Sequence, residues 1–379
     1  MIPVNEPLIS SKAKKYIKDC LDTGWISSAG RYINDFENSF KNYIGTKYGV
    51  TTTSGTTALH LALAAAEVGP GDEVIIPDLT IISCALSVIY QGATPVLIDV
   101  EYTTGNIDPK KIEGKITKRT KAIMVVHLYG HPANMEPILK IAKEHKLLVI
   151  EDSAESHGAE VFVNGKWKKT GSIGDINCFS FYGNKIITTG EGGIVLTNRQ
   201  KLFKRASFLK DLAHSAKRRF YHKEIGYNFR MTNIQAALGL AQMGEIEKYL
   251  KKKKWMAKLY SEGLREIDIL ELPREEDYAK SVYWMFAPRT KKGSKISRDK
   301  FCEQLRGMGI DTRTYFIPLH KQPVLKRYNF NSSEFSISRD LSNRGFYLPS
   351  GLAITEQQIK KVILSIKQIA KKVKNGQIN

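Results

Sequence analysis

The sequence predicts an α/β fold in which a mostly parallel central sheet is covered by helices on both faces. Between residues 73 and 152, short and almost continuously apolar segments alternate with helical segments. Strands buried on both faces have this composition, and consecutive parallel strands need a crossover connection, usually a helix. Beyond about residue 250 the alternation ends. We therefore expect a large α/β domain at 1–250, with a helical N-terminal segment, and a small α+β domain at 251–379.

The N-terminal segment is expected to form two helices joined by a loop. Ser10 or Ser11 can cap the first helix, which we expect to end near Gly24. The second helix covers roughly 34–44. The loop between them carries a large aromatic residue, Trp25, which we expect to be exposed.

A β-branched strand at 49–53 is expected to turn at Ser54 and Gly55 into an apolar helix. The first N–H groups of a helix have no internal partner and the helix dipole favours negative charge there, so this Ser-Gly-Thr turn, which ends at Thr56, is a natural anion site. A capping turn without a ligand explains the same residues equally well. The spacing matches neither the GxGxxG pattern nor the Walker loop, which disfavours nicotinamide and ATP sites.

The remaining elements follow from apolar runs, turn residues and capping signals. Strands are expected at 74–78, 94–100, 121–130, 147–152, 175–181 and 194–198. Helices are expected at 82–90, after Asp108-Pro109, at 135–145, and from Thr232 to beyond Glu247. A hairpin is expected at 161–168 around an Asn164-Gly165 turn. The C-terminal part is expected to contain a strand at 283–288, a helix at 299–307 and a last helix begun by a Thr355/Gln358 capping box.

The composition is that of an ordinary globular protein, with 42% hydrophobic and 25% charged residues. No apolar run approaches the length of a membrane span and the first residues do not resemble a signal peptide, so we expect a cytoplasmic protein with no membrane partner. The cysteines are scattered and lack metal-ligand spacing, so we expect reduced, buried thiols and no metal site. They are Cys20, Cys84, Cys178 and Cys302.

The net charge of +20 makes a polyanion a partner to consider. However, the lysines are spread along the chain and no nucleic-acid-binding motif accompanies them, so an anionic small substrate explains the excess at least as well. We expect no nucleic-acid partner. A basic, aromatic stretch at 217–223 fits a site for a base and a diphosphate, or a packed loop with a solvated edge, equally well.

A single lysine, Lys185, lies between two glycine breaks, one at Gly183 and one at 190–193. In the strand that precedes it, Phe179 and Phe181 face one side and Ser180 faces the other. An amine displayed in this way can reach a bound electrophile, and we interpret Lys185 as holding an aldehyde cofactor as a Schiff base. Considered alone, the residue is far more typical of a solvated loop lysine, and the other stretches have to overturn that reading.

Asp152 strengthens the cofactor interpretation. It follows four apolar strand residues and Glu151, so its carboxylate is partly desolvated and needs a cationic or N–H partner. Ligands of α/β sheets gather at the carboxyl ends of the strands, where Asp152, the Ser54 turn and the segment 127–130 are all expected. Pyridoxal phosphate (PLP) needs a lysine, an acid for its ring nitrogen and an anion cradle, and these stretches together with Ser180 supply one of each.

With these residues assembled, the chain resembles the DegT/DnrJ/EryC1/StrS sugar aminotransferases, a family of fold-type I PLP-dependent enzymes. The resemblance extends from end to end and rests on motifs in a fixed order. These are Trp25-Ile-Ser-Ser-x-Gly30, Ser54-Gly-Thr56, Pro70-Gly-Asp-Glu-Val74, His127-Leu-Tyr-Gly130, Glu151-Asp-Ser-Ala-Glu-Ser-His-Gly-Ala159, Phe179-Ser-Phe-Tyr-Gly-Asn-Lys185, Thr189-Gly-Glu-Gly-Gly193, Gly226-Tyr-Asn-x-Arg-Met-Thr232 and Pro318-Leu-His320.

The resemblance implies a role for each matching residue in the cofactor site. Lys185 is expected to bind the cofactor aldehyde and act as general acid/base, Asp152 to pair with the ring nitrogen, and Glu155 to lie near the ring hydroxyl. The residues expected to hold the phosphate are Gly55, Thr56, Ser180 and, from a second subunit, Asn228. The last role implies a homodimer with sites at the interface.

The family also implies the reaction. An amino group is expected to pass from glutamate, through the pyridoxamine form of the cofactor, to the keto carbon of a nucleotide-linked 4-keto-6-deoxy sugar. The expected acceptor is C4 of a GDP-linked 4-keto-6-deoxymannose, with a dTDP-linked sugar as the alternative. The candidate sugar-nucleotide contacts are Trp25, Tyr221, His222, Arg230 and His320.

Two positions depart from the family pattern. Ile81 stands where an aromatic residue usually stacks on the cofactor ring, and Thr314 replaces a common proline. A dehydratase that uses pyridoxamine phosphate without a Schiff base, and a non-enzymatic PLP-binding protein, are competing interpretations. In the related dehydratases histidine occupies the position of Lys185, so the lysine favours amino transfer.

Overall fold

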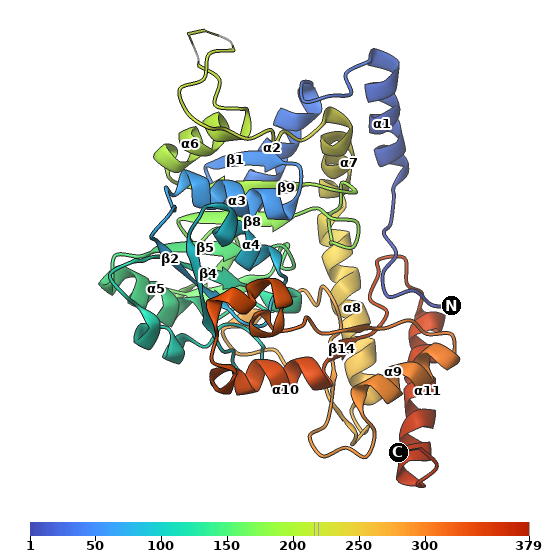
Figure 1. Ribbon diagram of the computed structural model, residues 1–379. Coiled ribbons are helices and arrows are strands. Elements are labelled where there is room, and N and C mark those ends of the chain that lie inside the picture. The colour runs from blue at the N-terminus through green and yellow to red at the C-terminus, as the bar shows by residue number, and fades with distance from the viewer. Residues whose placement is uncertain (216, 219, 379) are drawn as a thin grey trace.

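The computed structural model describes residues 1–215, 217–218 and 220–378, and its central element is a seven-stranded sheet (Figure 1). The strands lie in the order β1 (Tyr48–Thr52), β9 (Gly193–Thr197), β8 (Ile176–Ser180), β5 (Leu148–Asp152), β4 (Thr120–Val126), β2 (Glu73–Pro77) and β3 (Thr94–Ile98). Only β9 in this sheet runs against its neighbours. The predicted mostly parallel sheet is therefore confirmed.

Helices cover both faces of this sheet, as predicted. One face carries α3 (Gly55–Ala65), α4 (Ser83–Tyr90) and α6 (Gln200–Lys210). The other face carries α2 (Arg31–Ile44), α5 (Met135–Glu144) and α7 (Asn233–Met243). Successive residues of a strand enter different cores, since Ile75 packs with α5 and Ile76 packs with α3 and α4.

Local sequence signals set the positions of the elements at the carboxyl end of the sheet, where ligands are expected to bind. Ser54 caps α3 in a capping box with Thr57, so the helix begins at Gly55, directly after the turn. Phe179 of β8 and Phe181, just beyond the end of that strand, pack against the aromatic face of α2. Ser180, between them, points toward the start of α3, as the alternation predicts.

Several predicted elements match closely. Ser10 caps α1 (Ser11–Thr23), and Gly24 ends it in a left-handed conformation. The hairpin of β6 (Glu160–Val163) and β7 (Lys166–Lys169) turns at Asn164 and Gly165, both with positive φ, and pairs with β11 (Ala279–Lys280). Short 3₁₀ helices connect other elements: η1 (Pro109–Lys111), η2 (Glu113–Lys115), η3 (Leu128–Gly130), η4 (Leu319–Lys321), η5 (Pro323–Tyr328) and η6 (Ser332–Phe335).

The long helix predicted from Thr232 to beyond Glu247 is wrong. It is two helices, α7 and α8 (Ile246–Leu264), because Glu245 leaves helical geometry after Gly244, a poor helix former. α8 then runs from the sheet-bearing part into the C-terminal part (Figure 1). The expected boundary at residue 250 falls inside this continuous helix, and the division into two domains stays a prediction.

Beyond α8, and besides β11, the described C-terminal residues form three α-helices and four two-residue strands. They are β10 (Leu270–Glu271), β12 (Arg289–Thr290), α9 (Arg298–Gly307), β13 (Arg313–Thr314), α10 (Ser336–Arg344), β14 (Phe346–Tyr347) and α11 (Glu356–Lys374). The strand predicted at 283–288 is wrong, since that segment is irregular and Tyr283 has a φ of 48°. Ile2 bridges to Ile310, so the N-terminus lies beside the C-terminal helices (Figure 1).

The four cysteines are free and buried, as predicted. Over the residues that the structure describes, no helix combines the length and apolarity that crossing a bilayer requires.

Candidate active site

A cavity of about 310 Å³ opens where the carboxyl ends of β4, β5 and β8 meet the start of α3. This size suits a small-molecule site, and its location is the one expected for ligands of α/β sheets. Six of the residues expected at the cofactor line it. They are Gly55, Thr56, Asp152, Glu155, Ser180 and Lys185.

The start of α3 forms an open cradle beside Ser180. A Cβ atom added to Gly55 would lie 2.6 Å from the Cβ of Ser180, so only glycine leaves this space free. The hydroxyl of Thr56 lies 2.9 Å from that of Ser83. Hydroxyl groups thus surround the first N–H groups of a helix, which have no acceptor within it. This donor set fits a phosphate group.

Asp152 ends β5 and is 2% exposed. Its Oδ1 accepts a hydrogen bond from the N–H of Ala154 at 3.0 Å, and its Oδ2 accepts one from the thiol of Cys84 at 3.3 Å. Burial raises the pKa of Asp152 although both contacts oppose the shift. Among the ion pairs of the described residues, none includes Asp152. A buried carboxylate of this kind fits a protonated ring nitrogen.

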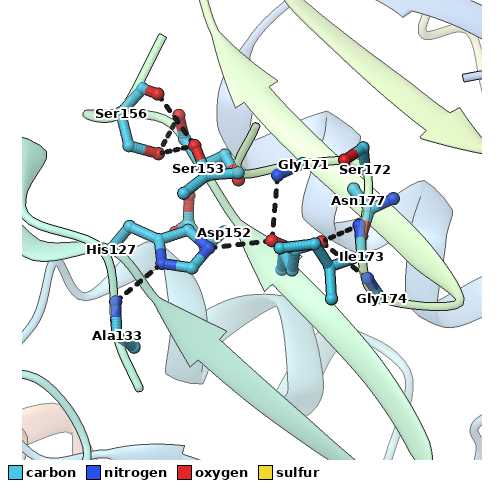
Figure 2. A network of polar contacts seen from close by, with 12 residues as sticks. His127, Ala133, Asp152, Ser153, Ser156, Gly171, Ser172, Ile173, Gly174 and Asn177 are labelled. Carbon is cyan, nitrogen blue, oxygen red and sulfur yellow. Dashed lines mark hydrogen bonds and ion pairs between the residues drawn. The ribbon is translucent and has the colours of Figure 1, made fainter. Parts of the chain in front are cut away.

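A buried network holds the strand that carries Asp152 (Figure 2). Nδ1 of His127 accepts from the N–H of Ala133 at 3.0 Å, so its Nε2–H donates to Glu151 at 2.9 Å. Glu151 also accepts N–H groups of the loop before β8, those of Gly171, Ile173 and Gly174. Although burial opposes it, these donors lower the pKa of Glu151. The ionised Glu151 therefore ties β4, β5 and the start of β8 together, and His127 serves the sheet and does not face the cavity.

Lys185 is an inward-facing lysine, because its side chain is only 11% exposed. Its Nζ lies 3.6 Å from Oε1 of Glu155 and 4.0 Å from the centre of the Trp284 ring. Glu155 is oriented by the N–H of Tyr129, which donates to its Oε2 at 2.7 Å. Burial raises the pKa of Glu155, and the charge of Lys185 opposes that shift. The arrangement places an amine and two carboxyl groups around one cavity and does not fit a solvated loop lysine.

The other candidates lie away from this cavity. Trp25 is exposed and borders a separate cavity of about 470 Å³ together with Arg31. Asn228 is exposed and accepts a hydrogen bond from Nε of Arg230 at 3.0 Å, while the same arginine pairs with Asp211. Tyr221 and His222 are also exposed, and His222 bonds the carbonyl of Leu212. Of the basic stretch that contains them, Arg219 lies outside the described residues.

His320 has a buried side chain. Its Nδ1 lies 2.7 Å from Oδ2 of Asp78, and its ring stacks on Phe335. The motif that suggested a substrate contact therefore joins the segment around His320 to Asp78. The side chain of His320 does not line the cavity.

No local sequence signal points to the wall contributed by the C-terminal part, which consists of Trp284, Phe316 and Tyr347. These residues come from three separate segments that only tertiary structure brings together. Cys84, interpreted above only as a core thiol, contacts Asp152. Ile81 lines the cavity and is partly exposed, so an aliphatic side chain does occupy the position noted above.

Comparison with known proteins agrees with this geometry. The chain matches the DegT/DnrJ/EryC1/StrS aminotransferase family over residues 7–367. It is 42% identical to a GDP-perosamine synthase of Caulobacter vibrioides, over 97% of this chain and 98% of the relative, and 41% identical to one of Escherichia coli O157:H7 over the same shares.

Solved structures show the same fold. An aminotransferase from Psychrobacter cryohalolentis superposes with a TM-score of 0.89 at 29% identity, covering 98% of this chain and 100% of that one. A Streptococcus pneumoniae protein assigned as a sugar aminotransferase, in its PMP form, gives a TM-score of 0.93 at 25% identity and 99% coverage of both chains. The same protein is known in a PLP form. The chain therefore belongs to the DegT/DnrJ/EryC1/StrS aminotransferase family, whose fold-type I architecture and PLP dependence it shares.

Proposed function

We propose that the chain transfers an amino group from glutamate to C4 of a GDP-linked 4-keto-6-deoxymannose, giving GDP-perosamine. One observation carries the aminotransferase chemistry: the amine of Lys185, the buried carboxylate of Asp152 and the cradle at Gly55 border the same cavity. The sugar follows from similarity to GDP-perosamine synthases at 42%, 41% and 36% identity.

The six cofactor residues that line the cavity each have a task in this proposal. Bound PLP supplies an aldehyde and an electron-accepting ring. Asp152 accepts the hydrogen bond of the ring nitrogen, and Gly55, Thr56 and Ser180 bind the phosphate. The Nζ of Lys185 is placed to take a proton from the substrate carbon and to return it at the neighbouring position. Glu155 attracts that amine and would interact with the ring hydroxyl of bound PLP.

A second candidate substrate is a dTDP-linked keto-sugar. A dTDP-3-amino-3,6-dideoxy-alpha-D-galactopyranose transaminase of Aneurinibacillus thermoaerophilus is 35% identical to this chain over 91% of it. Purified protein with glutamate and PLP is offered a panel of GDP- and dTDP-linked 4-keto and 3-keto sugars, and the products are identified by mass spectrometry. Fastest turnover of the GDP-linked 4-keto sugar supports the proposal, and a dTDP-linked sugar as best substrate overturns it.

We further propose that the enzyme is a cytoplasmic homodimer. Asn228, the expected phosphate contact, is exposed and does not border the cavity of its own chain, which suits a residue that reaches a second subunit. Exposed apolar side chains at Trp25, Tyr221 and Ile225 are consistent with a surface that another chain covers. The free cysteines suit a reducing compartment.

A further inference from the structure

Trp284 contacts Lys185 in two ways. The Nζ of Lys185 lies 4.0 Å from the centre of the indole ring, and the indole N–H donates to the carbonyl of Asn184 at 2.8 Å. One rigid ring thus touches both the amine and the peptide group that precedes the lysine. Trp284 is only 2% exposed and borders the cavity, so these contacts are shielded from water.

The other contact of the amine does not fix its direction. The Nζ of Lys185 lies 3.6 Å from Glu155, which is too long for a hydrogen bond, so the carboxylate attracts the amine without orienting it. A lysine side chain is long and flexible and loses much rotamer freedom when it is held. An aromatic face attracts a cation most strongly where water is excluded. The indole therefore restricts the positions open to the amine.

The backbone of Trp284 is clamped on both sides. The preceding residue, Tyr283, is held in a left-handed conformation with a φ of 48°. On one side, a Cβ atom on Gly130 would lie 2.7 Å from the amide nitrogen of Trp284, so the two segments are in close contact. On the other side, Nζ of Lys253 donates to the carbonyl of Trp284 at 2.8 Å.

Lys253 of α8 is unusual because it is 2% exposed. Its partners are the carbonyls of Trp284 and Ser350, and none of the ion pairs formed by the described residues includes it. Burial lowers its pKa to about 7, and an amine can donate to two carbonyls in either protonation state. Burying such a group is costly unless its hydrogen bonds are made, so its place under Trp284 calls for a specific task.

We propose that Trp284 is the positioning residue for Lys185 and that Lys253 holds Trp284 in place. The indole orients the amine toward the substrate carbon when the lysine is free of the cofactor, and its N–H fixes the backbone at Asn184. The inference rests on the proposed role of Lys185 in proton transfer and extends it to two residues outside the cofactor contacts.

Kinetics provide the first test. Trp284→Leu removes both contacts, whereas Trp284→Phe keeps an aromatic face. We expect Trp284→Leu to lower kcat about tenfold, ~1.4 kcal/mol in transition-state free energy, while KM for glutamate and the Kd of PLP stay within about twofold. Trp284→Phe recovers part of the loss. An unchanged kcat in Trp284→Leu, or a loss confined to KM, overturns the proposal.

The hairpin offers a matched control. Nζ of Lys280 lies 4.1 Å from the ring of Trp167 and pairs with Glu160, but this lysine–indole–carboxylate set is at the surface, where Trp167 is 40% exposed. Trp167→Leu is expected to leave kcat unchanged. If it lowers kcat as much as Trp284→Leu does, the effect does not come from positioning and the proposal is overturned.

A second readout needs neither turnover nor a stable Trp284 variant. In cofactor-free wild-type protein with isotope-labelled lysines, protons on Cε of Lys185, identified by their loss in Lys185→Ala, are expected to be shifted upfield by the indole ring current. An unshifted resonance overturns the proposal. Because no sugar is present, this result is independent of which substrate, if any, the wild-type enzyme turns over.

Discussion

Nε2 of His127 lies 2.9 Å from Oε2 of Glu151, and both side chains are completely buried. The pair joins β4 to β5 one residue before Asp152, so it fixes the strand end that carries the proposed partner of the ring nitrogen.

His127→Ala leaves the charge of Glu151 with one donor fewer, and losing a hydrogen bond to a buried charged group typically costs about 1.5–3 kcal/mol. We expect a loss of that order in the free energy of unfolding, measured with urea. His127→Gln, which can donate to Glu151, loses less. His222→Ala, at an exposed position, serves as the control with a change within about 0.5 kcal/mol. Equal stability of His127→Ala and the wild type contradicts this account of the network.

Lys185→Ala removes the amine that is proposed to bind the cofactor aldehyde. Borohydride treatment of PLP-loaded wild-type protein is expected to fix the cofactor on the peptide that contains Lys185, as mass spectrometry of a digest shows. The variant gives no such adduct. Lys280→Ala removes the surface lysine that also faces an indole, and it keeps the adduct. An adduct of equal yield in Lys185→Ala rejects the assignment.

Asp152→Asn keeps the shape of the side chain but removes the negative charge that the ring nitrogen is proposed to meet. PLP binds to this variant through the cradle at Gly55, while turnover falls at least about a hundredfold because the ring no longer accepts electron density well. Absorbance of the bound cofactor and kcat are measured on the same sample. Wild-type kcat in Asp152→Asn sinks the proposed role.

Asn228 is proposed to serve the cavity of the partner subunit. Asn228→Ala and Lys185→Ala homodimers are then both impaired, but co-expressed differently tagged chains form mixed dimers in which one site has both residues intact. Purified mixed dimers regain turnover. As a control, a mixed dimer pairs a wild-type chain with a chain that carries both changes. Neither of its sites has both residues intact, so its turnover stays impaired. Activity of a sedimentation-verified monomer contradicts the dimer proposal.

Stability is expected to fall as the medium becomes acidic. Burial lowers the pKa of His131 to about 4 and that of His157 to about 3, below the ordinary value near 6.5. The unfolded chain then binds more protons between about pH 6.5 and 4, so the stability present above pH 6.5 is lost as the pH falls. Urea unfolding at pH 7 and pH 5 measures this loss. His131→Gln reduces it, and an identical pH dependence in the variant refutes the assignment.

The fold was predictable where the signals are local. Ser54 and Gly55 mark the start of α3, and Asn164-Gly165 marks the hairpin, because each residue type is demanded by the geometry at its own position. The break at Glu245 and the irregular segment around Tyr283 were missed, since the local pattern favours a continuous helix and a strand and only tertiary packing decides otherwise.

The candidate site divides in the same way. Lys185, Asp152 and the cradle at Gly55 follow strand ends and turns that can be read along the chain, and the structure brings them to one cavity. Trp284 and Tyr347 could not be found, because nothing in their neighbourhoods indicates a cavity more than a hundred residues earlier in the chain. The substrate contact expected of His320 stays a prediction, and its sequence motif does not reveal that Asp78 and Phe335 bury its side chain.

The aromatic wall has a consequence for biosynthesis. During translation Lys185 and Asp152 emerge from the ribosome well before Tyr347, and the backbone of Ile2 cannot pair until Ile310 has emerged. The sheet can form as it emerges, but the cavity closes only after the residues of the aromatic wall have left the ribosome. Closure of the cavity is therefore a late maturation event, and chains truncated before Tyr347 should leave the ribosome with the cavity open.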